Sequence, residues 1–194
     1  QTLRERLAYA IGTEFVLPVQ AFGSGDRLVL SRPGRGDRVP VRRAGPASRV
    51  IHLVVHPEGS DAALQTPQAQ KFIQAGEQVL AIDAFQTGAA VEPRDRSGGY
   101  FLTFNRSDDA NRVQDILTAI SYLVLQSPQR IHLHGTGRAA IWCLFAAAVS
   151  EYPVALEADM AGFSGTDQEF IDQFFVPGIQ RAGGLKAARR VLAN

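Results

Sequence analysis

The chain has a single cysteine in 194 residues, so an internal disulfide is excluded. Cys143 lies in an apolar run, where we expect a small buried side chain rather than a reactive thiol. Cysteine content therefore leaves the cellular compartment open. A start at Gln1 is compatible with a processed or exported protein, with a fragment and with a shortened chain, and the sequence does not choose among them.

An excess of one charge is also missing, because 20 Lys and Arg residues face 19 Asp and Glu residues. We therefore expect no whole-molecule field that would hold nucleic acid or an anionic membrane. Arginines do gather between Arg32 and Arg49, and we expect them on the solvent face of a hairpin, with a tight turn at residues 35–37. Binding of a phosphate or carboxylate by some of them is the alternative. No apolar run is long enough to span a bilayer.

Apolar runs bounded by turn residues alternate with segments of helical period. This alternation predicts an α/β fold with a doubly wound, mostly parallel sheet and helices on both faces. We expect one domain over residues 1–194, with a helix and lead-in over 1–26 and the sheet core over 27–194. Four neighbouring parallel strands are predicted at 51–55, 79–83, 131–134 and 154–156. A strand pair at 28–30 and 39–41 is expected at one edge of the sheet, because Pro40 suits an edge strand.

Capping residues predict where the helices begin and end. A first helix should end at Gly12, and a second should begin at Pro67 after Thr66 and end at Gly76. Residues 139–150 are apolar on nearly every side, so that helix should be buried. Further helices are expected after Ser107 or Asp108, after the capping box Thr166–Glu169 and up to Pro177, and over 185–192.

The segment Gly135-Thr136-Gly137-Arg138-Ala139 joins a predicted strand directly to a helix of small residues. In a nucleophile elbow, Gly-x-Ser-x-Gly, small flanking residues permit a sharp turn that presents the middle residue at the helix N-terminus. Here the middle residue is Gly137, which has no side chain. The same glycines also suit an ordinary tight turn or a phosphate-binding loop, although neither common phosphate-binding glycine pattern is present.

Several segments in order resemble the α/β-hydrolase superfamily, and within it bacterial esterase-like proteins related to acetyl-xylan esterases and dienelactone hydrolases. Residues 53–59 (LVVHPEG) look like the family's third strand and oxyanion loop, and residues 79–88 (VLAIDAFQTG) look like the next strand and loop. Residues 111–116 (NRVQDI) are similar to the helix before the elbow. The resemblance covers about residues 27–154. It implies a nucleophile position at Gly137 and an oxyanion-loop position at His56 and Pro57.

The sequence departs from this family at the residues that carry catalysis. Gly137 replaces the serine, and Pro57 lacks the amide hydrogen that an oxyanion loop could use. The family's triad acid and histidine follow its last two strands, which we expect to be missing before Asn194, so that the sheet is truncated or completed from elsewhere. Thr136 should point away from the site. Ser164 and Asp159 are weak candidates for a nucleophile and an acid, with local capping and loop roles as the alternatives.

His132 and His134 share one face of a strand, and a metal site could use both. A third ligand is not apparent near them, so we interpret them as structural histidines and expect no metal and no cofactor.

Two functions remain open. In the first, the chain is a catalytically degenerate domain that binds a partner, an ester or a carbohydrate, or stabilises a larger assembly. In the second, it is part of a hydrolase of carboxylic esters, carbohydrate esters among them, with non-standard or externally supplied catalytic groups. We favour the first, because loss of triad members leaves only weak residual catalysis. The sheet edge at 154–156 should be covered by another chain, by a missing segment or by the 170–176 region.

Overall fold

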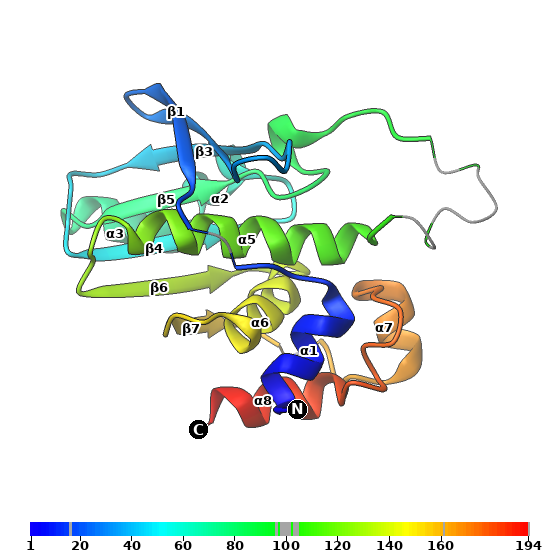
Figure 1. The fold of residues 1–194 in the computed structure, drawn as a ribbon. Helices are drawn as coiled ribbons and strands as arrows, with labels where there is room; N and C mark the ends of the chain where they lie inside the picture. The colour runs from blue at the N-terminus through cyan, green and yellow to red at the C-terminus, as the bar shows by residue number, and fades with distance from the viewer. Residues whose placement is uncertain (16, 96, 98–101, 103–104, 161, 194) are drawn as a thin grey trace.

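The computed structural model describes residues 1–193 except 16, 96, 98–101, 103–104 and 161. Within this part of the chain, seven strands form one mixed sheet in the order β1-β2-β3-β5-β4-β6-β7 (Figure 1). The strands are β1 (Gln20–Ser24), β2 (Arg27–Ser31), β3 (Val39–Ala44), β4 (Val50–Val55), β5 (Gln78–Ile82), β6 (Arg130–Gly135) and β7 (Ala155–Ala158).

The four predicted parallel strands are confirmed as neighbours. β5, β4, β6 and β7 run parallel in that order, with His52 opposite His132 and Leu53 opposite Leu133 where β4 meets β6. Every residue of β5 is buried, as expected of a strand covered on both faces. The carboxyl ends of these four strands therefore meet on one side of the molecule.

The amino-terminal half of the sheet is antiparallel, and here one prediction is wrong. β2 and β3 pair as expected, with Val29 opposite Pro40, but they do not form the edge. β1 adds outside β2, and β3 pairs with β5 on its other side. All five residues of β1 are exposed, so it has no apolar alternation that could reveal it. Pro40 thus lies in an interior strand, where its carbonyl accepts a hydrogen bond from the Asp83 amide at 2.9 Å.

Helices cover both faces of the sheet, as predicted (Figure 1). One face packs against the larger helical layer through side chains such as Leu53, Leu80 and Ile82. The other face packs against α2 and α3 through Val54 and Val79. The helices are α1 (Leu3–Ile11), α2 (Ser60–Gln65), α3 (Pro67–Gln74), η1 (Gly88–Ala90), α5 (Asp108–Val124), α6 (Ala139–Val149), α7 (Asp167–Gln173) and α8 (Gly184–Leu192).

The predicted helix ends are largely confirmed. Gly12 ends α1 in the left-handed conformation, and the side chains of Thr66, Ser107 and Thr166 cap α3, α5 and α7. All eleven residues of α6 are buried. α7 ends at Gln173, earlier than the predicted stop at Pro177. Among the described residues, no helix combines the length and apolarity needed to cross a membrane.

The expectation of solvent-facing arginines is wrong for Arg32, which is buried with 7% of its surface exposed. Its Nε donates to the Asp37 carboxylate, which supplies the opposite charge that a buried guanidinium requires. Arg35 is half exposed and pairs with Glu14 at 2.7 Å. This arginine stretch therefore contributes to the packing of the loop between β2 and β3.

The outer edge of the sheet at β7 bonds to β6 on one side only, within the described residues. The 170–176 region packs instead on α6, where Phe174 stacks on Phe145 with ring centroids 4.4 Å apart. Cover of this edge by another chain or by a further segment stays a prediction.

Candidate functional site

A sharp turn joins β6 to α6 through Thr136, Gly137 and Arg138. Gly137 has a φ of +54°, in the left-handed region that disfavours residues with a side chain. The helix starts immediately, because the Ala140 amide donates to the Gly137 carbonyl at 3.1 Å. A Cβ at Gly135 would lie 2.7 Å from the Cα of Ala140, so only glycine lets the helix pack this closely on the strand end.

The loop after β4 lies against this turn. A Cβ built at Gly137 would have the ring of Pro57 as its neighbour, at 3.7 Å. The Thr136 amide also donates to the Val55 carbonyl at 3.4 Å. His56 is held within its own loop, where its Nδ1 accepts a hydrogen bond from the Glu58 amide at 3.1 Å. The structure thus brings Pro57 and Gly137 together, and neither residue contributes a polar side chain there.

Asp83 orders the loops on the other side of β4. Its Oδ1 accepts a hydrogen bond from the Ser60 amide at 2.6 Å. A Cβ at Gly59 or Gly88 would come within 2.5 Å of the same oxygen, and both glycines have a positive φ. The two loops can therefore close on the carboxylate only because both positions are glycine.

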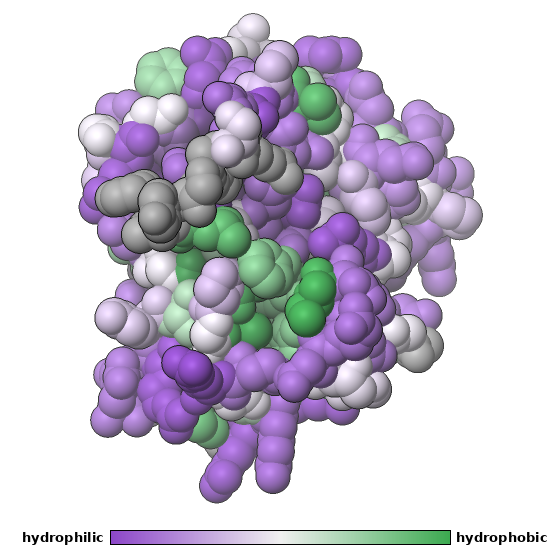
Figure 2. All heavy atoms as spheres, turned by 90° about the vertical axis from the view of Figure 1, so that its right-hand side faces the viewer, coloured by the Kyte–Doolittle hydropathy of each residue, from purple (hydrophilic) through white to green (hydrophobic). Residues whose placement is uncertain are grey.

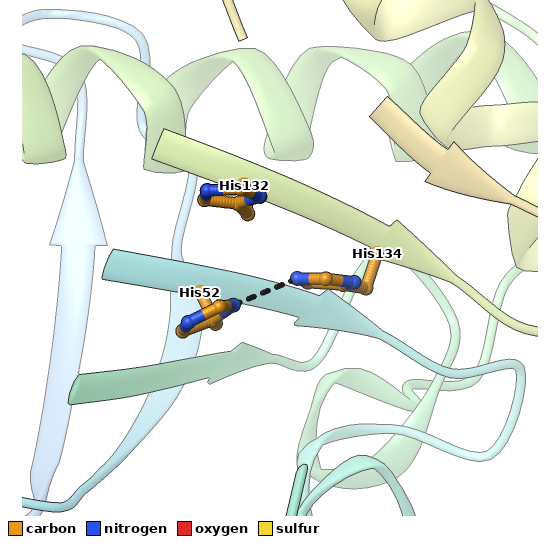
Figure 3. A group of neighbouring side chains, drawn as sticks. All are labelled: His52, His132 and His134. Carbon is orange, nitrogen blue, oxygen red and sulfur yellow. Dashed lines mark hydrogen bonds between the residues drawn. The ribbon is translucent and has the colours of Figure 1, made fainter. Parts of the chain in front are cut away.

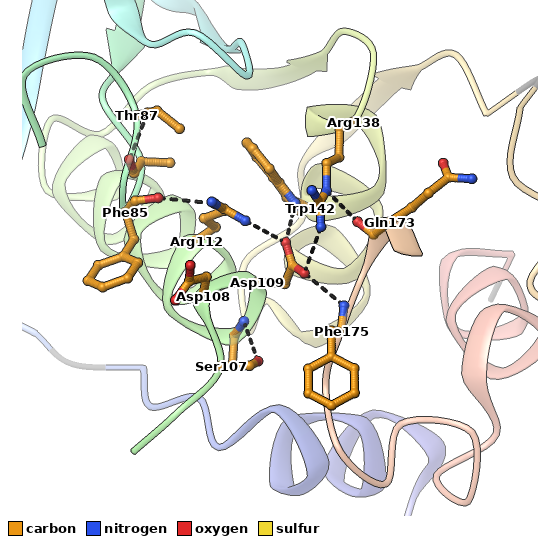
Figure 4. A network of polar contacts seen from close by, with 12 residues as sticks. Phe85, Thr87, Ser107, Asp108, Asp109, Arg112, Arg138, Trp142, Gln173 and Phe175 are labelled. Atoms are coloured by element: carbon orange, nitrogen blue, oxygen red, sulfur yellow. Dashed lines mark hydrogen bonds and ion pairs between the residues drawn. The ribbon is translucent and has the colours of Figure 1, made fainter. Parts of the chain in front are cut away.

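Asp109 is a buried hub that sequence reasoning missed (Figure 4). Its Oδ1 accepts hydrogen bonds from Trp142 Nε1 and Arg112 Nη1, both at 2.8 Å. Its Oδ2 accepts from the Phe175 amide at 2.7 Å and from Arg138 Nη2 at 3.3 Å. An acidic residue in the first turn of a helix ordinarily signals only the helix dipole, so the sequence carried no sign of this role.

Arg112 and Arg138 connect this network to the loop after β5 and to the end of α7 (Figure 4). The Arg112 guanidinium lies over the Trp142 ring at 4.6 Å, and its Nε donates to the Phe85 carbonyl at 3.0 Å. Arg138 Nε donates to the Gln173 carbonyl at 2.6 Å. The turn after β6 is therefore anchored to α5 and to the end of α7.

No protein-family model and no curated protein matches this chain. Solved structures do. An acetyl xylan esterase from a Paenibacillus species aligns with a TM-score of 0.52 and 14% identity, over 98% of this chain and 71% of its own length. Acetyl Xylan Esterase 1 from a Thermoanaerobacterium species gives 0.48, 14% identity, and 76% and 54% coverage. An α/β serine hydrolase homologue from Coxiella burnetii gives 0.47, 13% identity, and 68% and 61% coverage.

The fold is that of the α/β-hydrolases. At this level of identity the likeness shows the fold alone, and the chain spans little more than half the length of two of these proteins. In an open α/β sheet, ligands bind outside the carboxyl ends of the strands, where the loops of Pro57, Asp83 and Gly137 lie. What an α/β-hydrolase fold does there depends on the side chains it carries.

The weaker candidates from the sequence differ in their surroundings. Ser164 is exposed, and its hydroxyl donates to Glu169 Oε2 at 2.7 Å, within the cap of α7. Asp159 is exposed after β7. Thr136 Oγ1 is buried and has no hydrogen-bond partner among the described residues. Thr136 directly precedes Gly137 in the turn, and Asp159 follows Ala158, which pairs with Gly135 at the end of β6.

The expectation that no third ligand lies near His132 and His134 is wrong. His52 stands beside both on the α3 side of the sheet, and one nitrogen from each ring lies within 4.8 Å of the others (Figure 3). Burial lowers the pKa of His134 to about 4, although Glu157 opposes this, and burial also lowers the pKa of His52. The sequence could not reveal the cluster, because it depends on the register between β4 and β6.

Cys143 is fully buried in α6, and burial raises the pKa of its thiol. Its Sγ lies 3.7 Å from the His134 carbonyl. A buried thiol with a raised pKa is unreactive at neutral pH, which matches the small buried side chain expected from the sequence.

Proposed function

We propose that this chain is a catalytically inactive α/β-hydrolase-type domain with a binding or structural role in a larger protein or assembly. The observation that carries this proposal is Gly137, which occupies the turn after β6 with a φ of +54° and provides no hydroxyl. Covalent ester hydrolysis at such a turn needs an oxygen nucleophile whose proton a base removes. Gly137 offers only its backbone amide.

The surroundings of Gly137 support the same proposal. Pro57 fills the space beside it with a carbon ring and has no amide hydrogen to stabilise an oxyanion. Arg138 bonds to Asp109 and to the Gln173 carbonyl, so its guanidinium is committed to holding the turn in place. The turn thus serves as a structural junction between α5, α6 and the end of α7.

The surface at the carboxyl ends of the strands supports a binding role. Figure 2 looks onto this side and shows hydrophobic side chains gathered in the middle of the face, with hydrophilic ones around them. Ile171 and Phe175 in the α7 region are 58% and 40% exposed and line a cavity of about 540 Å³. Exposed apolar patches of this kind mark places where ligands or partner proteins bind.

The proposal is tested by incubating the chain with p-nitrophenyl acetate and with a fluorophosphonate probe, followed by mass spectrometry. We expect hydrolysis no faster than that of the heat-denatured chain, and no stoichiometric labelling, because fluorophosphonates require an activated hydroxyl. Thr136→Val and Ser164→Ala serve as matched variants and should behave like the unmodified chain. Stoichiometric labelling of Thr136 or Ser164 in the unmodified chain would contradict the proposal.

A second function, hydrolysis of carboxylic esters with an unusual or externally supplied catalytic group, is favoured by one observation. Thr136 Oγ1 is a buried hydroxyl without a hydrogen-bond partner among the described residues, directly beside Gly137. Buried hydroxyls are ordinarily bonded, so one that is not is a candidate for a functional group. Ester hydrolysis, acetylated carbohydrates included, that is lost in Thr136→Val and retained in Ser164→Ala would establish this second function.

A further inference from the structure

We infer that His52, His132 and His134 form a binding site for a zinc ion on the α3 side of the sheet. The site lies away from the carboxyl ends of the strands and does not depend on the proposed function. His52 comes from β4, and the other two come from β6, where residues two apart point to the same face. Because His52 is the direct neighbour of His132 across the two strands, all three rings project from one patch of the sheet (Figure 3).

The distances within the cluster suit a shared ion. His52 Nδ1 and His134 Nε2 are 2.9 Å apart, and one nitrogen of His132 lies within 4.8 Å of a nitrogen in each of the other rings. With Zn–N bonds of about 2.0–2.1 Å, two nitrogens on one tetrahedral zinc ion are separated by roughly 3.3 Å. Small side-chain rotations therefore bring all three nitrogens to bonding distance.

One ring nitrogen of each histidine lies next to a carboxylate. Glu77 Oε2 lies 2.7 Å from His52 Nε2, and Glu157 lies 3.2 Å from His132 Nδ1 and 3.4 Å from His134 Nδ1. Histidines that bind a metal ordinarily donate their second N–H to a carboxylate, which fixes the ring and its tautomer. The two carboxylates also supply negative charge next to the ion, and Phe72 stacks on His52 at 3.7 Å to hold its ring.

The contact between His52 and His134 has one position between the two nitrogens, which either a cation or a proton can occupy. A carboxylate only accepts hydrogen bonds, so His52 Nε2 carries the proton toward Glu77 and His52 Nδ1 has a lone pair. If His134 likewise donates from Nδ1 to Glu157, two lone pairs face each other at 2.9 Å. A cation between them removes this repulsion, and zinc has a third ligand available in His132.

A proton can also fill that position. Gln68 Nε2 lies 3.2 Å from His134 Nδ1 and would donate to it, so that His134 Nε2 donates to His52. This gives a metal-free chain of hydrogen bonds from Gln68 to Glu77. The two arrangements differ in whether zinc or a proton lies between His52 Nδ1 and His134 Nε2, and a measurement of zinc binding distinguishes them.

Solvent reaches the cluster from the β7 side. His52 and His134 are buried, but the His132 side chain is 19% exposed and the Glu157 side chain is 49% exposed. An ion can therefore enter past Glu157 without unfolding of the sheet. Three imidazole nitrogens favour zinc and its neighbours among the transition metals over calcium or magnesium, which prefer oxygen ligands.

The test uses the full chain without a histidine tag, freed of metal with a chelator and titrated with zinc chloride in a calorimeter. We expect one zinc ion per chain and a rise in the thermal unfolding midpoint on zinc addition, because a ligand that binds only the folded state stabilises it. Cobalt(II) should give visible absorption bands of a tetrahedral site. His132→Ala should weaken binding by more than about 100-fold, and Glu157→Gln by about 10- to 100-fold, as for changes next to metal ligands.

His56 provides the matched control, because it is the fourth histidine of the chain and lies outside the cluster. His56→Ala should bind zinc with unchanged affinity. Equal affinity of His132→Ala and the unmodified chain would overturn the inference, as would a loss in His56→Ala as large as that in His132→Ala. A folded, unmodified chain that takes up no zinc would also overturn it, and would leave the metal-free hydrogen-bond chain as the account of the cluster. His132→Gln repeats the measurement if the alanine variant does not fold.

Discussion

The turn after β6 and the histidine cluster on β4 and β6 provide different groups for binding a ligand. The turn has a backbone shaped to present a residue at a helix N-terminus, but the residue presented is Gly137. The cluster has three side chains able to bind a metal, held by Glu77 and Glu157, and it lies on a strand face covered in part by α3. Only two residues, Gly135 and Thr136, lie between His134 on β6 and Gly137 in the turn.

This difference shows that backbone geometry and side-chain chemistry are set independently. The turn keeps its shape because Gly135 admits the close approach of α6 and because Asp109 anchors Arg138. Neither interaction needs a reactive side chain at position 137. The fold therefore indicates where loops converge, whereas the chemistry must be located from the side chains.

The largest effect on stability is expected when the side chain that anchors the turn is removed. Asp109→Ala takes the partner from Trp142 Nε1, the Phe175 amide and two arginines at once. Because Trp142 Nε1 is left buried without an acceptor, and the partly buried Phe175 amide, Arg112 and Arg138 lose theirs at Asp109, we expect a loss of about 3–5 kcal/mol in the free energy of unfolding. Urea denaturation followed by tryptophan fluorescence measures it.

Asp108→Ala is the control for that prediction. Asp108 is the neighbouring carboxylate and pairs with Arg94 at 3.1 Å, with both side chains about one fifth exposed. We expect a loss no larger than about 1 kcal/mol, as for pairs that water reaches. Similar losses in the two variants would mean that Asp109 does not anchor the turn.

The next prediction compares the two glycines of the turn. A Cβ at Gly135 meets backbone atoms of Ala139 and Ala140 at 2.7–2.9 Å, whereas a Cβ at Gly137 meets only Pro57 at 3.7 Å. We expect Gly135→Ala to cost about 3 kcal/mol through overpacking. Gly137→Ser should cost only about 1–2 kcal/mol, the strain of a left-handed residue.

Ester hydrolysis separates the two roles of position 137. Gly137→Ser should stay folded and still hydrolyse p-nitrophenyl acetate no faster than the unmodified chain. Among the described residues beyond its chain neighbours, the side chain within 4 Å of a Cβ at position 137 is the Pro57 ring, which cannot act as a base for the new hydroxyl. Denaturation curves and initial rates of the same samples provide both readings. A large gain in rate would show that the rest of the catalytic machinery is present, and the proposal of an inactive domain would fail.

The sequence predicts this fold well where local rules decide. The four parallel strands follow from apolar runs such as residues 51–55, and the helix ends follow from caps such as Thr66 and Ser107. β1 escaped prediction because its residues are all exposed, and tertiary pairing alone makes it a strand.

The candidate site is less predictable, because its contacts join distant segments. Gly137 and Pro57 could be placed at one end of the sheet by a family resemblance. His52 joins His132 only through the register of two strands, and Asp109 bonds to Phe175 across 66 residues of sequence. No local pattern encodes such contacts, so they emerge only when the strands and helices are assembled.

The last prediction concerns a buried acid in α5, Asp115. Burial raises the pKa of Asp115 in α5 from its ordinary value of 3.8 to about 8, with Asp37 reinforcing the shift while the Phe85 amide, Arg32 and Arg112 oppose it. Because the folded pKa lies above the unfolded one, the folded chain holds a proton that the unfolded chain has released. The contribution of Asp115 to stability is therefore largest below pH 4, falls as pH rises, and levels off above pH 8. The slope is at most about 1.4 kcal/mol per pH unit for one proton.

Asp115→Asn mimics the protonated acid and should remove this slope, so urea midpoints at pH 6, 7, 8 and 9 should diverge progressively between the two chains up to pH 8. His132→Ala should keep the slope, because His132 lies on the other side of the sheet. Parallel pH curves for the unmodified chain and Asp115→Asn would show that Asp115 is ionised in the folded protein.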